Sequence, residues 1–205
     1  MKKIKWTINS FLLLLLLCSV LFLNKCAADR QSEQNRLAEF DNDIAIAWNH
    51  MAYTVAYQHD QFYSFIGVRT LAMTHIAIHD ALNAIQPKYE QYAFKGLVPN
   101  ASPIAASSQA AYEVLISVYP DRKDTLKAEL QLWLSGLKEG KATELGIALG
   151  KKSAEAILQK RKGDGHEKNG HYTPMTKPGD YQYTPGYDWV WKPDFPRSAR
   201  LYSIQ

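Results

Sequence analysis

Five residues with charged, imidazole or amide side chains stand within one largely apolar stretch of the sequence and are the strongest candidates for chemistry. We call them the polar strip: Arg69, His75, His79, Asp80 and Asn83. At about 100° per residue along a helix, all five fall on one arc, while the opposite side carries Leu71, Ile78, Leu82 and Ile85. Because ionisable groups are costly to bury without partners, this pattern predicts a helix that is central in its domain, with a polar strip facing groups that satisfy it.

The two histidines of the strip raise the possibility of a metal site. His75 and His79 are four residues apart and share a helix face at a spacing that suits two metal ligands. A catalytic zinc needs a third protein ligand, and Asp80 points about 100° away from His79, so it cannot complete the set locally. We therefore favour hydrogen bonds from the histidines to carbonyls or carboxylates of neighbouring helices over a metal-dependent hydrolase.

The charged members of the strip do not pair with each other. Arg69 and Asp80 share a side of the predicted helix, but eleven residues at 1.5 Å rise place them about 16 Å apart. Each therefore needs a partner on another segment of the protein.

The first 28 residues have the pattern of an export signal, with a basic start, an apolar core at 11–23 and a small-residue exit ending at Ala28. The apolar run is about 13 residues, against about 20 for a membrane span, so we expect cleavage after Ala28 rather than a permanent anchor. Lipidation of Cys26 is the alternative, although Lys25 before it is a poor match to lipoprotein processing. The expected location is the periplasm or the cell surface.

Removal of residues 1–28 changes the charge and the thiol content. The segment holds four lysines and no acidic residue, so 24 basic residues become 20, against 20 acidic residues. A neutral chain gives no support for nucleic-acid or anionic-membrane binding. Both cysteines, Cys18 and Cys26, lie in the signal, so we expect neither a disulfide nor a thiol nucleophile. The remaining 177 residues (205 minus 28) suit one domain.

Hydrophobic spacing predicts an all-α helical bundle. After a flexible lead-in at 29–36, a helical domain over 37–162 is expected to contain about five helices, at 37–58, 61–86, 104–118, 121–137 and 143–162. Ser102 followed by Pro103 is a helix-start signal, and Asp121 is the expected cap of the fourth helix. Gly146, Gly150 and Ala154 predict a ridge of small residues that lets another helix approach closely.

Residues 163–205 form an irregular segment rich in proline, glycine and aromatic residues. Asp164 and Gly165 are expected to end the last helix, with Gly163 or Gly165 in a left-handed conformation. His166 and His171 give the spacing HExxxH in a loop, which is a weak zinc signal. The aromatic residues predict that the segment wraps over the helices or over sequence beyond this chain.

An ordered series of motifs resembles the N-terminal half of bacterial vanadium-dependent haloperoxidases and the related type 2 phosphatidic acid phosphatases. The resemblance runs from about Trp48 to Gln205 and rests on order and spacing. The motifs are Trp48-Asn49, the stretch RTLAMTHIAIHDALNAI at 69–85, the alanine-rich run 105–115 ending in Tyr119-Pro120, AILQKRKGDG at 156–165, Tyr172-Thr173-Pro174 and Pro178-Gly179.

The resemblance implies an all-helical fold with an oxyanion site, which holds vanadate in the peroxidases and substrate phosphate in the phosphatases. The family's site combines a lysine with an Arg-Pro pair, a Pro-Ser-Gly-His motif and a late Ser-Arg followed by a histidine and an aspartate. This pattern does not occur here, and Ser198-Ala199-Arg200 has the wrong spacing for the late motif. No catalytic residue, cofactor-binding residue or metal ligand is therefore carried over, although vanadate is implied for a complete family member.

These observations predict the N-terminal helical portion of an exported haloperoxidase-like or acid-phosphatase-like protein. It lacks the half that binds vanadate or phosphate and is expected to be inactive alone, as in a truncated reading frame or a split gene. Its expected partner is that C-terminal half or a second copy of itself. The alternative is a freestanding helical binding or scaffold protein of the cell envelope.

Overall fold

The structure is a computed structural model that describes residues 13, 15–27, 42–61, 65–166 and 177–180. Every regular element within these residues is a helix, which confirms the predicted all-α class. The elements after the leader are α2 (Asp43–Asp60), α3 (Ile66–Ile85), α4 (Pro103–Val118), the 3-10 helix η1 (Pro120–Arg122), α5 (Lys123–Ser135) and α6 (Lys141–Lys160).

The chain divides into two compact units, Met1–Asp41 and Asn42–Gln205. In the first unit, residues 15–27 form a helix whose leucine side chains are largely exposed. None of the helices that the structure describes combines the length and the apolar character needed to cross a membrane. The predicted lead-in at 29–36 lies outside the described residues.

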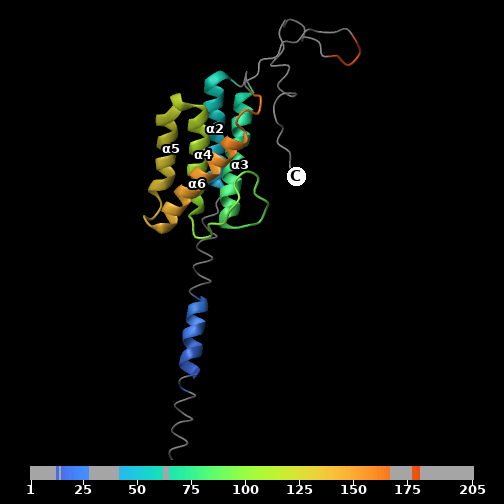
Figure 1. Cartoon of the computed structure of the whole chain (residues 1–205). Helices are drawn as coiled ribbons and strands as arrows, with labels where there is room; N and C mark the ends of the chain where they lie inside the picture. The colour runs from blue at the N-terminus through green and yellow to red at the C-terminus, as the bar shows by residue number, and fades with distance from the viewer. Residues whose placement is uncertain (1–12, 14, 28–41, 62–64, 167–176, 181–205) are drawn as a thin grey trace, which may run out of the picture. The chain divides into compact units, whose positions relative to one another are not determined.

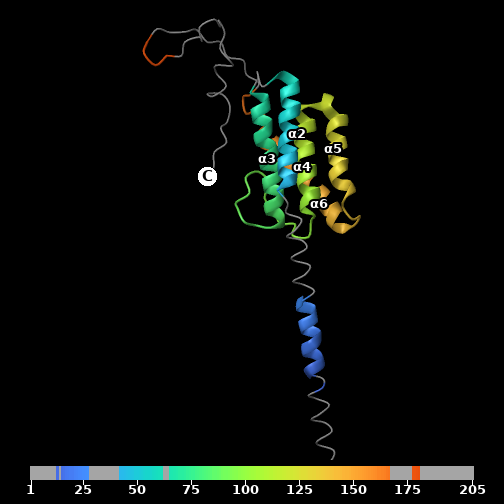
Figure 2. The ribbon, with the colours of Figure 1, turned by 180° about the vertical axis from the view of Figure 1, so that it is seen from behind.

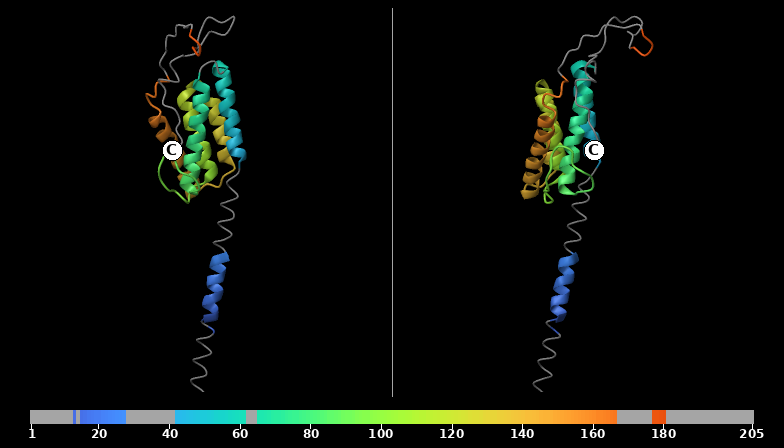
Figure 3. Two further views of the ribbon diagram at one scale, coloured as in Figure 1. Left: turned by 90° about the vertical axis from the view of Figure 1, so that its right-hand side faces the viewer. Right: turned by 45° about the vertical axis from the view of Figure 1, so that its right-hand side comes forward.

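The second unit contains a bundle of helices that run side by side, as Figure 1 and the reverse view in Figure 2 show. Helix α4 packs against α2, α3, α5 and α6, so α4 is the central helix. The polar-strip helix α3 also lies inside the bundle, since it packs against α2, α4 and α6. Helix α4 has more neighbours, because its alanine and serine side chains are small and let other helices approach on several sides. Helices α2 and α6 lie on opposite sides of the α3–α4 pair (Figure 3).

Two predicted helix starts were wrong for local reasons. Gln61 is the C-cap of α2, with φ 54° and its N–H bonded to the carbonyl of Tyr57, so α3 begins only at Ile66. Asp121 lies inside η1, because the N–H of Arg122 bonds to the carbonyl of Tyr119 at 3.0 Å and delays α5 to Lys123. The side chain of Asp121 pairs with Arg122 at 3.2 Å.

The start of α4 is as predicted. Ser102 is in an extended conformation, its hydroxyl accepts a 3.4 Å hydrogen bond from the N–H of Ala105, and Pro103 occupies the first turn. The N–H of Ser102 also donates to the carbonyl of Ala142 at 2.9 Å, which joins the starts of α4 and α6.

The predicted small-residue ridge forms the contact between α6 and α4. A Cβ atom on Gly146 would lie 2.7 Å from the carbonyl oxygen of Ser102, and one on Gly150 would lie 2.5 Å from that of Ala106. Both distances are too short for a real side chain, so glycine at these positions sets how closely the two helices approach. Ala154, one turn further, is fully buried.

Candidate functional site

Asp80 binds the backbone of the loop that follows α3, which covers residues 86–102. Its side chain is fully buried, and one oxygen accepts a 2.7 Å hydrogen bond from the N–H of Tyr92. The other oxygen accepts from the N–H groups of Ala93 and Phe94 at 2.7 and 2.8 Å. Three donors converge on one carboxylate, so the partner of Asp80 is a loop backbone and not a cation.

Asn83 and His79 add contacts to the first part of the same loop. The side-chain oxygen of Asn83 accepts from the N–H groups of Lys88 and Tyr89 at 3.1 and 2.8 Å. Nε2 of His79 lies 3.0 Å from the carbonyl oxygen of Glu90, which accepts from the ring N–H. The expected histidine-to-carbonyl bond is present, although the carbonyl belongs to a loop and not to a helix.

A loop residue that the sequence reasoning did not single out completes this set. The amide nitrogen of Gln91 donates to the carbonyl oxygens of Asp80 and Gly96 at 3.0 and 3.1 Å. Its amide oxygen accepts from the N–H of Gly96 at 3.1 Å. Lys160 of α6 stands 4.5 Å above the ring of Tyr92, a cation–π contact that ties the loop to a second helix.

His75 faces α2. Its Nε2 lies 2.9 Å from the side-chain oxygen of Asn49, which accepts from the ring N–H. Burial disfavours the charged ring and lowers the pKa of His75 below its ordinary value of 6.5. The structure therefore uses the two histidines for different neighbours, with His75 joining α2 to α3 and His79 joining α3 to the loop.

A shared metal ion has no support from these contacts. Among the residues that the structure describes, no three histidine, cysteine or acidic side chains are grouped so that they could hold a metal ion. His166 of the HExxxH spacing is described, whereas Glu167 and His171 lie outside the described residues.

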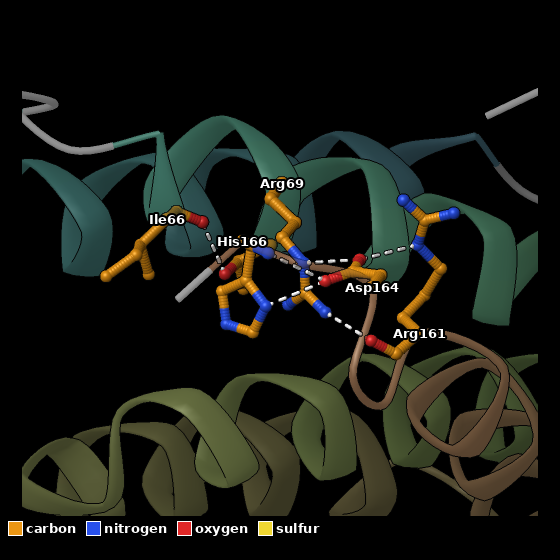
Figure 4. A network of polar contacts seen from close by, with 6 residues as sticks. Ile66, Arg69, Arg161, Asp164 and His166 are labelled. Carbon is orange, nitrogen blue, oxygen red and sulfur yellow. Dashed lines mark hydrogen bonds and ion pairs between the residues drawn. The ribbon is translucent and has the colours of Figure 1, made fainter. Parts of the chain in front are cut away.

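Arg69, the remaining member of the strip, takes part in a buried ionic network after the end of α6 (Figure 4). Its Nε donates to Asp164 at 3.1 Å, and its Nη2 donates to the backbone carbonyl of Arg161 at 3.0 Å. The guanidinium of Arg161 forms a second ion pair with the same oxygen of Asp164 at 3.1 Å. As predicted, Arg69 finds its partner on another segment and not at Asp80.

His166 contacts the second oxygen of Asp164. Its Nδ1 lies 2.8 Å from that oxygen, and its backbone N–H donates to the same oxygen at 3.2 Å. Asp164 reaches these partners because Gly163 and Gly165 both adopt positive φ, 64° and 90°, as predicted for the end of the helix. The chain turns sharply there and directs the Asp164 carboxylate toward α3.

Opposing effects act on the pKa of Asp164, which is fully buried. Desolvation by burial is the largest single effect and would raise the pKa. Hydrogen bonds from His166 and Arg69, together with the charge of Arg69, outweigh it and hold the pKa below the ordinary carboxyl value. The ionised carboxylate is therefore the stable form in the fold.

Residue spacing does not predict which residues join Arg69 in this network, which also contains Arg161, Asp164 and His166. The arginine and the aspartate are 95 residues apart, and the stretch Arg161 to Gly165 predicted only a helix end. A buried arginine on α3 could indicate that an acidic partner exists, but nothing in the spacing identifies which one.

The described residues of the strip all serve to hold backbone and helices together. An oxyanion site needs several cationic donors that converge on an added ligand. Here the donors of Arg69, Arg161 and His166 converge on a carboxylate of the same chain. These contacts hold the turn after α6 against α3.

Comparison of the chain with models of protein families, with curated protein sequences and with solved structures finds no match. The functional conclusion therefore depends on the contacts above and on the motifs of the sequence.

Proposed function

We propose that this chain is the N-terminal helical portion of an exported protein similar to vanadium-dependent haloperoxidases or type 2 phosphatidic acid phosphatases. In this proposal the described helices are a scaffold. Halide oxidation by peroxide, or phosphate ester hydrolysis, depends on an oxyanion site formed by residues outside these 205. Vanadate is the implied cofactor of the complete peroxidase.

The observation that carries the proposal is that four of the motifs behind the resemblance contact one another. Trp48 donates from its indole nitrogen to Ser108 at 3.2 Å, which joins the first motif to the alanine-rich run. Its neighbour Asn49 bonds to His75, and Arg69 of the same helix bonds to Asp164 at the end of the AILQKRKGDG stretch. Motifs far apart in sequence thus contact one another directly, and the Trp48–Ser108 bond among these contacts is buried, which supports their origin as one structural signature.

The proposal is tested by the ability of the isolated chain to bind vanadate. The chain purified without residues 1–28 is equilibrated with vanadate and separated from free ion, and bound vanadium is counted per chain. We expect no stoichiometric binding, because Arg69, Arg161 and His166 are already paired with the Asp164 carboxylate. Stoichiometric binding would show that these residues already contain an anion site and would contradict the proposal.

A freestanding helical binding or scaffold protein of the cell envelope is the second candidate. It is favoured by exposed apolar side chains on the outer surface of α2 and α3, among them Ile46 at 59% and Val68 at 59% exposed. A chain that is a monodisperse monomer and melts cooperatively would favour this candidate. Association or aggregation of the purified chain would favour the scaffold half of a larger enzyme.

A further inference from the structure

The outward side of α2 carries an apolar row that continues onto α3. We call it the outer face and define it by four residues: Ile46, Tyr53, Tyr57 and Val68, which are 59%, 51%, 50% and 59% exposed. The three α2 residues recur at spacings of seven and four, so they line one side of the helix. That side is opposite the one that buries Trp48, Ala52 and Val55 in the core.

Tyr53 and Tyr57 give this face a defined shape. Their rings are parallel to within 6°, and their centroids are 6.2 Å apart. The Asn49–His75 bond fixes the antiparallel register of α2 and α3. Tyr57 is eight residues after Asn49 on α2, and Val68 is seven residues before His75 on α3. Because the helices are antiparallel, these two side chains lie at about the same distance along the bundle axis from the Asn49–His75 bond. The tyrosines and Val68 therefore belong to one end of the bundle.

The chain leaves the described bundle at this same end. Asp164 contacts Arg69, the residue directly after Val68, and the described backbone continues only to His166. Residues 177–180 form a turn, closed by a 3.0 Å bond from the N–H of Asp180 to the carbonyl of Lys177. From His166 to Tyr181 there are 15 residues, which extend to about 50 Å, whereas α3 is about 30 Å long. Every part of the outer face is within reach.

Residues 181–205 are rich in aromatic and proline residues, which suit binding to the exposed apolar side chains of the outer face. The segment carries six aromatic residues before position 196, and its prolines at 185, 193 and 196 favour an extended backbone. Extended proline-containing segments bind to surfaces of exposed aromatic rings with little loss of backbone entropy. A tethered segment also acts at an effective concentration of about 1 mM, which a second copy of the chain does not match in dilute solution.

We propose that the aromatic segment 181–196 of the same chain docks on the outer face, with its aromatic and proline side chains against Tyr53, Tyr57 and Val68. This inference does not depend on the proposed function. It assigns the exposed apolar row to an intramolecular partner rather than to a second copy or a different protein.

Contact quenching of a fluorophore by tryptophan tests the docking directly. In the full chain with Cys18→Ser and Cys26→Ser, a bimane is attached through Val68→Cys, and its emission is compared with that of the same chain carrying Trp189→Phe and Trp191→Phe. These changes keep aromatic rings while removing the quenching indoles. We expect the bimane emission to be about two-fold or more higher in the chain with Trp189→Phe and Trp191→Phe. A tethered segment at about 1 mM occupies a site of millimolar affinity at least half of the time, so the tryptophans would quench at least about half of the labelled molecules.

Two controls make the result specific. A bimane at Leu97→Cys, on a side chain that is 70% exposed at the other end of α3, is expected to be unaffected by the tryptophan changes. Tyr57→Ser is expected to raise the emission of the Val68 label, and Leu132→Ser on α5 is not. Quenching that does not change with Trp189→Phe and Trp191→Phe overturns the proposal. Quenching that grows with protein concentration also overturns it and assigns the face to a second copy.

Discussion

Asp164 is the shared partner of three side chains at one end of the bundle. The variant Asp164→Asn keeps the size of the side chain but removes the charge that Arg69, Arg161 and His166 share. We expect a loss of about 3–5 kcal/mol in the free energy of unfolding, the usual effect of removing one partner from a buried ion pair. Denaturant unfolding followed by circular dichroism measures it.

The control for Asp164 is the exposed pair of Glu90 and Lys95, whose side chains are 82% and 58% exposed. Glu90→Gln is expected to leave the unfolding midpoint unchanged, because water screens this pair.

The pKa of Asp164 lies below its ordinary value in the fold, so the stabilisation from its ionised form is complete above the unfolded pKa of about 3.9 and is lost as the pH falls through the folded value. An Asp164→Asn variant as stable as the native chain at pH 7 would contradict the structural role of the network.

Asp80 is expected to hold the 86–102 loop. In Asp80→Asn one oxygen is replaced by a donor, so at least one of the N–H groups of Tyr92, Ala93 and Phe94 loses its acceptor. We expect a loss of about 1.5–3 kcal/mol, the contribution of a hydrogen bond to a charged group. Amide exchange measured by NMR should be faster at these three residues and unchanged in Glu144→Gln, an exposed residue of α6. Unaltered exchange at all three amides would contradict the assignment.

His75 is expected to make stability depend on pH near neutrality. Burial lowers its folded pKa, so the unfolded chain binds the proton more readily and stability falls as the pH drops through about 6.5. Thermal melts between pH 8 and pH 5 measure the slope. The variant His75→Gln, which retains a donor for Asn49, should reduce that slope, and an identical slope in both proteins would show that His75 does not contribute.

At the residue scale the sequence located the polar strip but not its partners. Helical periodicity is a local property, so it placed Arg69 to Asn83 on one arc and showed that Arg69 and Asp80 are too far apart to pair. The partners come from a loop backbone and from a turn 95 residues away in the chain. Neither leaves a pattern in the sequence, because backbone N–H groups are the same at every residue and tertiary proximity is set by packing.

Among the helix–helix contacts, the one between α4 and α6 leaves no room for a larger side chain at Gly146 or Gly150. The variant Gly150→Ala places a Cβ 2.5 Å from the carbonyl oxygen of Ala106 and 2.8 Å from the N–H nitrogen of Ala110. Both are backbone atoms, so the helices must separate, and we expect a loss of about 1–3 kcal/mol in stability. Differential scanning calorimetry measures it.

Gly136→Ala is the matched control for the ridge. Gly136 has a right-handed backbone with φ of −80°, and nothing lies within 4 Å of an added Cβ. Alanine there should be neutral or stabilising by about 0.4–1 kcal/mol, because it restricts the unfolded chain. If both variants were equally stable, the ridge would not set the distance between α4 and α6.

The sequence predicted a helix boundary correctly where a hydrogen bond between neighbouring residues sets that boundary. Ser102 and Pro103 predicted the start of α4 correctly because capping is a contact between near neighbours. Asp121 failed as a cap because Pro120 opens a 3-10 turn first, and Gln61 failed as a helix start because it ends α2 in a left-handed conformation. The central position of α4 was missed for another reason: small alanine and serine side chains carry little hydrophobic signal, although they permit the closest packing.

For the whole molecule, we propose that the described helices are a scaffold and that the oxyanion chemistry depends on residues outside these 205. The strip residues on α3 form hydrogen bonds with α2, with the 86–102 loop and with the turn after α6. In this proposal the bundle positions other helices, and the resemblance implies that those helices carry the oxyanion site. The outer face is the part of the bundle where we propose that the chain's own aromatic segment packs.

The most direct test of this account is to read the coding DNA beyond codon 205, in all three frames. The account predicts a continuing in-frame or frameshifted segment that encodes an Arg-Pro pair, then Pro-Ser-Gly-His, then Ser-Arg followed by a histidine and an aspartate. Finding that order would supply the oxyanion site that the proposal assigns to residues outside these 205. If no frame encodes Pro-Ser-Gly-His, the proposal that this chain is the N-terminal helical portion of such an enzyme is wrong. A freestanding helical binding protein then becomes the better explanation of the chain's function.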